Sequence, residues 1–178
     1  MAVRICDDEK PYVEWIDGQS FPKVSLQRKH GKLEWRFGAL LDALGGTQGE
    51  VAAEWRCYLP DGPHGPSTLV PDVAFISFER LRSLSDQEVE QPPFAPDVVV
   101  EIRSPSYRER LAAEKIALYL RYGTRVVLDV DPERRCITAH APEGVAAFDQ
   151  SATFEHAAVP WLRFEIAPLF ANLEFRRG

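Results

Sequence analysis

Two hydrophobic periods alternate along the chain, one typical of amphipathic helices and the other of strands. Apolar residues recur at helical spacing in segments 24–46 and 106–122, which predicts two helices. Ser25 is a suitable N-cap for the first helix, and Gly45 with Gly46 can end it. The apolar stripe of that helix is formed by Leu26, Leu33, Phe37, Leu40, Leu41 and Leu44.

Val-rich and aromatic runs bounded by Pro, Gly and Ser predict the strands. We expect them at residues 50–59, 68–77, 96–104, 125–130 and 136–141, with a polar surface excursion at 78–95. The strand–helix–strand order between 97 and 130 implies a parallel pair with a right-handed crossover. The earlier strands favour an antiparallel meander. Together they predict an α/β fold in which helices pack on a mixed β-sheet.

Length and composition favour one soluble domain. The chain has 178 residues, of which 45% are hydrophobic, and a formal net charge of -6. This acidity argues against a protein that coats DNA without regard to sequence, because such binding depends on neutralising phosphates. The first 22 residues carry five acidic and two basic side chains. We therefore expect a solvated arm at 1–22 and a single domain at 23–178.

The three cysteines, Cys6, Cys57 and Cys136, are far apart and show no CxxC spacing. A zinc site or a disulfide framework is therefore not expected, and reduced thiols fit a cytoplasmic protein. No apolar run approaches the ~18 residues that a membrane helix needs. The N-terminus lacks the basic-then-apolar layout of a signal peptide.

Charged residues stand where the pattern predicts buried positions. The strand in "PDVVVEIRSPS" ends with Glu101 and Arg103 on one face, at the C-terminal end where sites of α/β sheets tend to lie. Lys115 lies in the middle of the apolar stripe of the second helix, which is expected to pack back on this strand. Asp72 follows Pro71 at the entry to a Val-Ala-Phe-Ile run. Buried charges need partners or a cation.

Each of these features has a simpler explanation when taken alone. Pro-Asp is a common turn signal, Glu101 and Arg103 can form an ion pair at a sheet edge, and Lys115 can extend its ammonium to solvent. The combination is less generic. Two carboxylates that converge at a strand end are hard oxygen ligands of the kind Mg²⁺ prefers. A nearby ammonium can orient or deprotonate a water molecule, or offset charge on a phosphate.

At these residues the chain resembles the PD-(D/E)xK nuclease superfamily, and more closely the Uma family of restriction-endonuclease-like proteins. The family pattern appears here as "PDVAFI", "VVVEIRSPS", "EKIALYLRYG" and "VVLDVDP", and the resemblance spans about residues 25–140. It implies a restriction-endonuclease-like core. It also implies that Asp72 and Glu101 bind Mg²⁺ or Mn²⁺, with the backbone carbonyl of Ile102 as a further ligand, and that Lys115 is catalytic.

The resemblance also assigns accessory residues. Tyr119, His30 and Glu54 match a Tyr, a His and an acidic residue common in the family. In the family the catalytic Lys stands on the helix, so Lys115 takes that role, and Arg103 occupies the strand position where the superfamily usually has Lys. Arg stays protonated and cannot act as a base. Arg103 can instead bind a phosphate or pair with Glu101.

His30 and its neighbour Glu34 allow two interpretations. His30 is either a buried, hydrogen-bonded core residue or an accessory group beside the metal. Six basic residues likewise form either a rim for a nucleic-acid backbone or a solvated helix face: Arg28, Lys29, Lys32, Arg36, Arg108 and Arg110.

The sequence thus predicts a metal-dependent DNA endonuclease that hydrolyses phosphodiester bonds. We also expect a homodimer, because cutting both strands needs two active sites or two visits. The apolar tail 165–175 and the aromatic-rich segment 52–59 are candidate self-contacts. The alternative is a nuclease-fold protein that binds nucleic acid or a protein partner without cutting. A third possibility is a structural protein whose charges are only ion pairs, which would not bind a metal.

Overall fold

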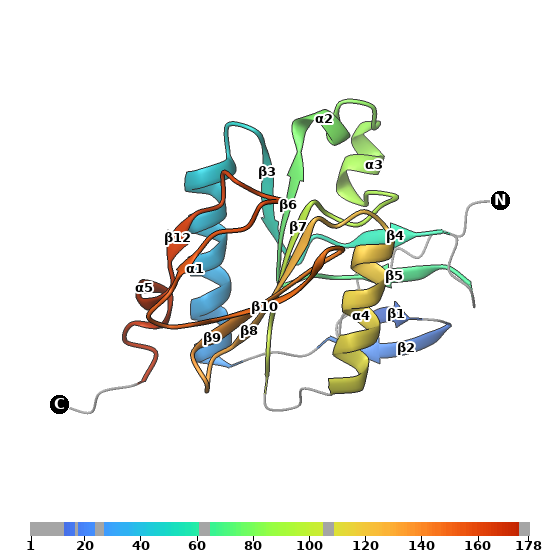
Figure 1. Cartoon of the computed structure of the whole chain (residues 1–178). Coiled ribbons are helices and arrows are strands. Elements are labelled where there is room, and N and C mark those ends of the chain that lie inside the picture. The colour runs from blue at the N-terminus through green and yellow to red at the C-terminus, as the bar shows by residue number, and fades with distance from the viewer. Residues whose placement is uncertain (1–12, 17, 24–26, 61–64, 105–108, 175–178) are drawn as a thin grey trace.

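A mixed six-stranded sheet forms the centre of the molecule (Figure 1). The structure, a computed structural model, describes residues 13–16, 18–23, 27–60, 65–104 and 109–174. The strand order is β10-β9-β8-β7-β6-β3, and only β7 and β8 are parallel within it. The strands are β3 (Gly49–Ala53), β6 (Val73–Ser77), β7 (Val98–Ile102), β8 (Val126–Asp131), β9 (Cys136–Ala141) and β10 (Gly144–Asp149).

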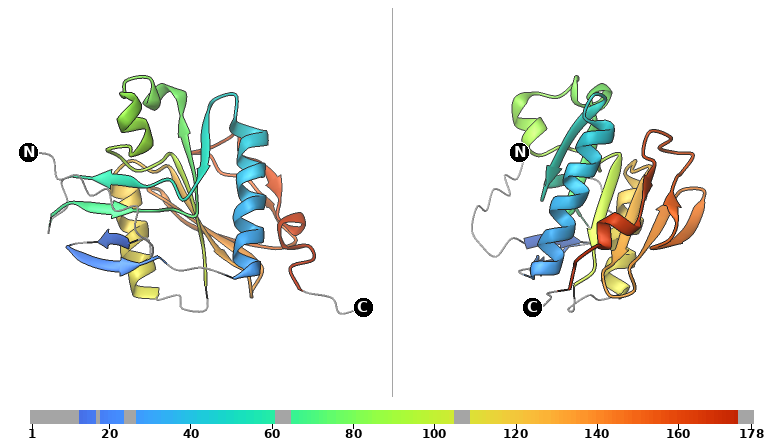
Figure 2. Two further views of the ribbon diagram at one scale, coloured as in Figure 1. Left: turned by 180° about the vertical axis from the view of Figure 1, so that it is seen from behind. Right: turned by 90° about the vertical axis from the view of Figure 1, so that its left-hand side faces the viewer.

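The two long helices cover opposite faces of this sheet (Figure 2). The helix α1 (Arg28–Gly45) packs with Val98 and Val100 in one core cluster, whereas α4 (Glu109–Arg121) packs with Val99 and Val127 in the other. The alternation of β7 between these two clusters follows from the pleat, which sends successive side chains to opposite faces. The predicted mixed sheet with helices packed on it is confirmed.

The first predicted helix is present with small differences. It begins after Gln27, which makes no side-chain cap, while Ser25 lies outside the described residues. It ends at Gly45 as expected. A Cβ atom at this glycine would lie 2.6 Å from the Trp161 ring, so the position has no room for a side chain.

The strands expected at 50–59 and 68–77 are each divided between two sheets, so the prediction of single strands is wrong. The first half of 50–59 forms β3, and the rest forms β4 (Cys57–Leu59) of a second, four-stranded sheet. Segment 68–77 divides in the same way into β5 (Ser67–Leu69) and β6. Glu54, in the left-handed region with φ 51°, and Pro71, which has no N–H to donate, stand at the two interruptions.

The second sheet also contains the described part of the N-terminal segment. Its order is β2-β1-β5-β4, with β1 (Val13–Ile16) and β2 (Gln19–Pro22) forming a hairpin. Glu14 and Ile16 of β1 are 5% and 2% exposed. Strand β1 is therefore packed into the fold and β2 is hydrogen-bonded to it with mostly exposed side chains, so the described part of the expected arm is a hairpin of the second sheet.

Short elements complete the chain. The surface excursion contains α2 (Phe78–Leu81) and α3 (Asp86–Glu90), the latter with a capping box between Ser85 and Glu88. The C-terminal part forms β11 (Thr153–Phe154), β12 (Phe164–Glu165) and α5 (Ala167–Phe170). Its apolar side chains, among them Ile166, Leu169 and Phe170, are buried in the α1-side core. This burial contradicts the expectation that the tail is a surface for self-contact.

Candidate active site

Asp72 and Glu101 lie beside each other where the two sheets meet. Strands β6 and β7 are antiparallel, and Val73 pairs with Val100, which places Asp72 next to Glu101 at the following position. Asp72 is 3% exposed. Its Oδ2 atom accepts the backbone N–H of Ile102 at 2.6 Å, at the position where a strand partner would otherwise bond. The strand pairing therefore places the two sequence-predicted residues at neighbouring positions, close enough for the charge of Asp72 to act on Glu101.

Two basic side chains contact the Asp72 carboxylate. Lys23, which follows β2, places its Nζ 2.9 Å from Oδ1, and His30 of α1 places its Nε2 3.2 Å from Oδ2. Burial alone would raise the pKa of Asp72, but Lys23 and His30 hold it well below its usual range. Asp72 is thus a charged carboxylate at neutral pH. Sequence analysis missed Lys23, because it stands between the expected arm and the first helix without any periodic signal.

Two residues of α4, one turn apart, contact the Glu101 carboxylate. Lys115 Nζ lies 2.8 Å from Oε1 and 2.9 Å from Oε2, and the Tyr119 hydroxyl donates to Oε1 at 2.8 Å. Burial raises the pKa of Glu101, and the charge of Asp72 acts in the same direction while Lys115 opposes it. The contacts with Glu101 show that the Lys115 side chain points toward the sheet, as the sequence predicts.

A third carboxylate, Glu14 of β1, reaches the same ammonium. Its Oε1 lies 3.0 Å from Lys115 Nζ and accepts the N–H of Val70 at 2.8 Å. Burial alone would lower the pKa of Lys115, but Glu101 and Glu14 raise it well above its usual range. Lys115 is therefore an ammonium that donates hydrogen bonds. Sequence analysis missed Glu14, because the acidic N-terminal segment was interpreted as a solvated arm.

Arg103 is held away from Glu101 by two aspartates of β8. Its guanidinium makes a bidentate contact with Asp129, at 2.9 and 2.7 Å, and a longer one of 3.5 Å with Asp131. The alternative of a Glu101–Arg103 ion pair is therefore wrong. Arg103 follows β7, and Asp129 is the β8 partner of Glu101, so this second charge pair lies next to the proposed site.

The other predicted accessory residues are arranged around Asp72. His30 is 6% exposed and hydrogen-bonded, and its Nδ1 is 3.9 Å from Glu34 Oε2. Both interpretations of His30 agree with this position. Burial raises the pKa of Glu34. Glu54 has an exposed side chain, and its backbone N–H donates to the carbonyl of Asp72 at 3.1 Å.

The predicted basic residues are not gathered into one rim. On α1, Lys29 contacts Glu133 and Glu174, and the other three donate to C-terminal carbonyl groups: Arg28 to Leu173, Lys32 to Asn172 and Arg36 to Leu169. On α4, Arg110 pairs with Glu114, while Arg108 lies outside the described residues. The α1 cations thus fasten the C-terminal segment to the helix.

The oxygen atoms of Asp72, Glu101 and the Ile102 carbonyl, where the two sheets meet, are suitable ligands for a hard divalent cation. Within the described ranges, no group of three or more His, Cys, Asp or Glu is arranged to hold a metal. Mg²⁺, however, needs only one or two carboxylates and completes its shell with water and substrate oxygens. In a strand, the N–H and C=O of one residue point to the same side, so the Ile102 carbonyl faces the Asp72 side of β7. Lys23 shows that a cation can be accommodated at Asp72.

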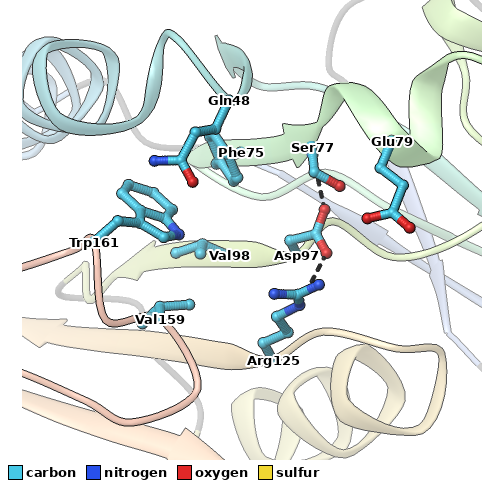
Figure 3. A pocket seen from close by; sticks show the side chains of 9 residues that line it. All are labelled: Gln48, Phe75, Ser77, Glu79, Asp97, Val98, Arg125, Val159 and Trp161. Carbon is cyan, nitrogen blue, oxygen red and sulfur yellow. Dashed lines mark hydrogen bonds and ion pairs between the residues drawn. The ribbon is translucent and has the colours of Figure 1, made fainter.

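A separate cavity of about 200 Å³ lies at the other end of β7 (Figure 3). Asp97, the second Pro-Asp aspartate of the sequence, accepts the N–H of Ser77 at 2.8 Å there. It also pairs with Arg80 and Arg125. Asp97 is therefore a buried, paired structural residue, far along the strand from Glu101.

Comparisons with known proteins identify the family and the fold of this chain. A family model, Uma2, described as "Putative restriction endonuclease", matches residues 2–167. The chain belongs to the Uma2 family. The fold resembles the crystal structure of a putative nuclease belonging to DUF820 from Anabaena variabilis ATCC 29413. The TM-score is 0.82, with 22% identity over 94% of each chain. The search of curated proteins found no match. In the described part of this Uma2 chain, none of the helices has the length and apolarity to cross a membrane.

Proposed function

We propose that this Uma2 protein is an endonuclease that hydrolyses phosphodiester bonds in DNA with the help of Mg²⁺ or Mn²⁺. The observation that carries the proposal is the convergence of Lys115 and Tyr119 on Glu101, directly beside the buried, charged Asp72. A purely structural ion pair does not need two carboxylates from adjacent strands at one point. Membership of a family described as restriction endonucleases supports the nuclease assignment.

The chain's own residues divide into ligands and orienting groups. Asp72, Glu101 and the Ile102 carbonyl would hold the cation, which supplies a Lewis acid and a water molecule of lowered pKa. His30 and the Ile102 N–H fix the Asp72 carboxylate, and Tyr119 fixes Glu101. Lys115 donates hydrogen bonds, so it orients a water molecule or stabilises negative charge on the phosphate. As an ammonium it does not accept a proton.

We further propose that the protein acts on DNA in the cytoplasm as a homodimer. A second function, binding of nucleic acid without cutting, is favoured by one observation. Arg103 stands at the strand position where the superfamily usually has its catalytic Lys; it is paired with Asp129 and Asp131 and cannot act as a base. The two functions differ in whether the bound metal gives turnover.

A cleavage assay on supercoiled plasmid tests the proposal. We expect wild-type protein to nick or linearise the plasmid with Mg²⁺ or Mn²⁺ and to do nothing in EDTA. Asp72→Asn and Lys115→Ala should abolish cleavage. Arg163→Ala removes an exposed cation that pairs with Glu155 on the surface, and should cleave as wild type does. Plasmid retardation without any cleavage would favour the binding function instead.

A further inference from the structure

The N-terminal hairpin contributes a carboxylate to the environment of Lys115. We infer that Glu14 is a positioning residue that fixes the direction of the Lys115 ammonium in the proposed reaction. This inference rests on the proposed function. It concerns a residue that neither contacts Asp72 nor is needed as a metal ligand.

Glu14 connects three parts of the site through one oxygen atom. Its Oε1 accepts the N–H of Val70, two residues before Asp72, and lies 3.0 Å from Lys115 Nζ. Lys115 in turn contacts both oxygens of Glu101. The side chain of Glu14 is buried, so water does not weaken these contacts. The hairpin is thereby tied to the segment that leads into Asp72 and to α4.

The tetrahedral geometry of the Lys115 ammonium means that its contact with Glu14 restricts its orientation. Lys has three N–H donors in a tetrahedral arrangement. One N–H directed between the two oxygens of Glu101 and a second N–H directed at Glu14 fix the direction of the third donor. With Glu101 as the only carboxylate partner, the ammonium at the end of its flexible four-carbon chain could rotate about the axis of that ion pair. The second carboxylate therefore supplies the orientation that a group acting on a water molecule or a phosphate requires.

The variant Glu14→Gln separates charge from structure. Its amide oxygen can still accept the Val70 N–H, but the negative charge opposite Lys115 is lost. The matched control is Glu165→Gln on β12, an exposed glutamate. We expect Glu14→Gln to lower kcat about 10–100-fold, as for other residues that orient a catalytic group, with little change in KM or in Mn²⁺ affinity. Glu165→Gln should behave as wild type.

A second measurement does not depend on activity. The Nζ and Cε resonances of Lys115, measured by NMR at one fixed neutral pH, should shift in Glu14→Gln relative to wild type, because the negative charge 3.0 Å from Nζ is lost, and should stay unchanged in Glu165→Gln. If Glu14→Gln does not fold, Lys115→Met provides the reciprocal test, and the Cδ resonance of Glu14 must then move.

The outcomes separate the two claims. Wild-type cleavage by Glu14→Gln, or unchanged Lys115 and Glu14 resonances, overturns the role of Glu14 and leaves the proposed function intact. Absence of cleavage by wild-type protein overturns the proposed function itself.

Discussion

Lys23 Nζ lies 2.9 Å from Asp72 Oδ1, so a side chain of the same chain holds a positive charge against the proposed metal ligand. The same ammonium donates to the carbonyl of Val70. This contact explains how Asp72 stays ionised while buried, since a buried charge without a partner is costly. It also means that a divalent cation would meet a competing cation.

Replacement of Lys23 by Met should therefore strengthen metal binding. The side chain keeps its approximate length but loses the charge that competes for Asp72. We expect Mn²⁺ affinity, measured by isothermal titration calorimetry, to rise about tenfold, which corresponds to about 1.4 kcal/mol. Lys29→Met is the control and should leave the affinity unchanged. Weaker binding in Lys23→Met would show that Lys23 supports the metal site and does not compete with it.

The contact between His30 and Asp72 predicts a pH-dependent stability. Burial alone would lower the pKa of His30, but the hydrogen bond and charge of Asp72 raise it above the usual 6.5. A raised pKa means that protonation favours the folded state, so this stabilisation is complete below pH 6.5 and is lost as pH rises through the folded-state pKa.

We therefore expect the free energy of unfolding in EDTA to decline above pH 6.5 in wild type, and this part of the decline to be absent in His30→Gln. Urea titrations of both proteins between pH 5.5 and 9 give the difference. His140, whose pKa burial lowers, acts with the opposite sign and is common to both proteins. A difference that grows with pH would contradict the contact.

Two tyrosines of the α4 region offer a matched pair. The Tyr119 hydroxyl donates to the Glu101 carboxyl group, which also pairs with the Lys115 ammonium, whereas the buried Tyr122 hydroxyl has no hydrogen-bond partner in the described structure. Hydrogen bonds to charged groups contribute about 1.5–3 kcal/mol. Tyr119→Phe should lower the free energy of unfolding by about that amount, while Tyr122→Phe should be neutral or stabilising. Equal losses in urea titrations would show that the hydroxyl of Tyr119 does not stabilise the site.

The homodimer remains a prediction, and the structure favours a different contact surface from the C-terminal tail. The tail is buried in the core of its own chain, whereas Trp35 on α1 is 73% exposed. Trp is one of the residue types enriched at protein–protein interfaces. We expect light scattering at micromolar concentration to give twice the chain mass of 20.1 kDa, and Trp35→Glu to reduce it to one chain. A single-chain mass for wild type would refute the dimer and favour nicking.

Two residues of the candidate site, Lys115 and Glu101, can be recognised in the sequence for identifiable reasons. Lys115 interrupts an apolar helical stripe, and Glu101 ends a buried strand, so both positions conflict visibly with their pattern. Lys23 and Glu14 could not be found in this way, because they belong to a short hairpin without a helical or strand period. Their partners are 47 or more positions distant in the sequence, as between Lys23 and Val70.

The division of two strands between sheets was also invisible in the sequence. Glu54 adopts a positive φ that glycine usually occupies, and nothing in its side chain signals this. The partners of Arg103 depend on strand register. Asp129 is brought beside Glu101 by the parallel pairing of β7 with β8. The sequence predicts that these two strands are parallel, but it does not predict which of their residues pair.

The central claim is that Asp72 and Glu101 bind one divalent cation. Crystals of wild-type protein soaked in Mn²⁺ test it directly through anomalous diffraction at a wavelength near the manganese edge. We predict one anomalous peak within about 2.0–2.4 Å of a carboxylate oxygen of each residue, with Lys23 displaced from Asp72. A difference map with no peak between these carboxylates, at a Mn²⁺ concentration that saturates the protein in solution, would contradict the account.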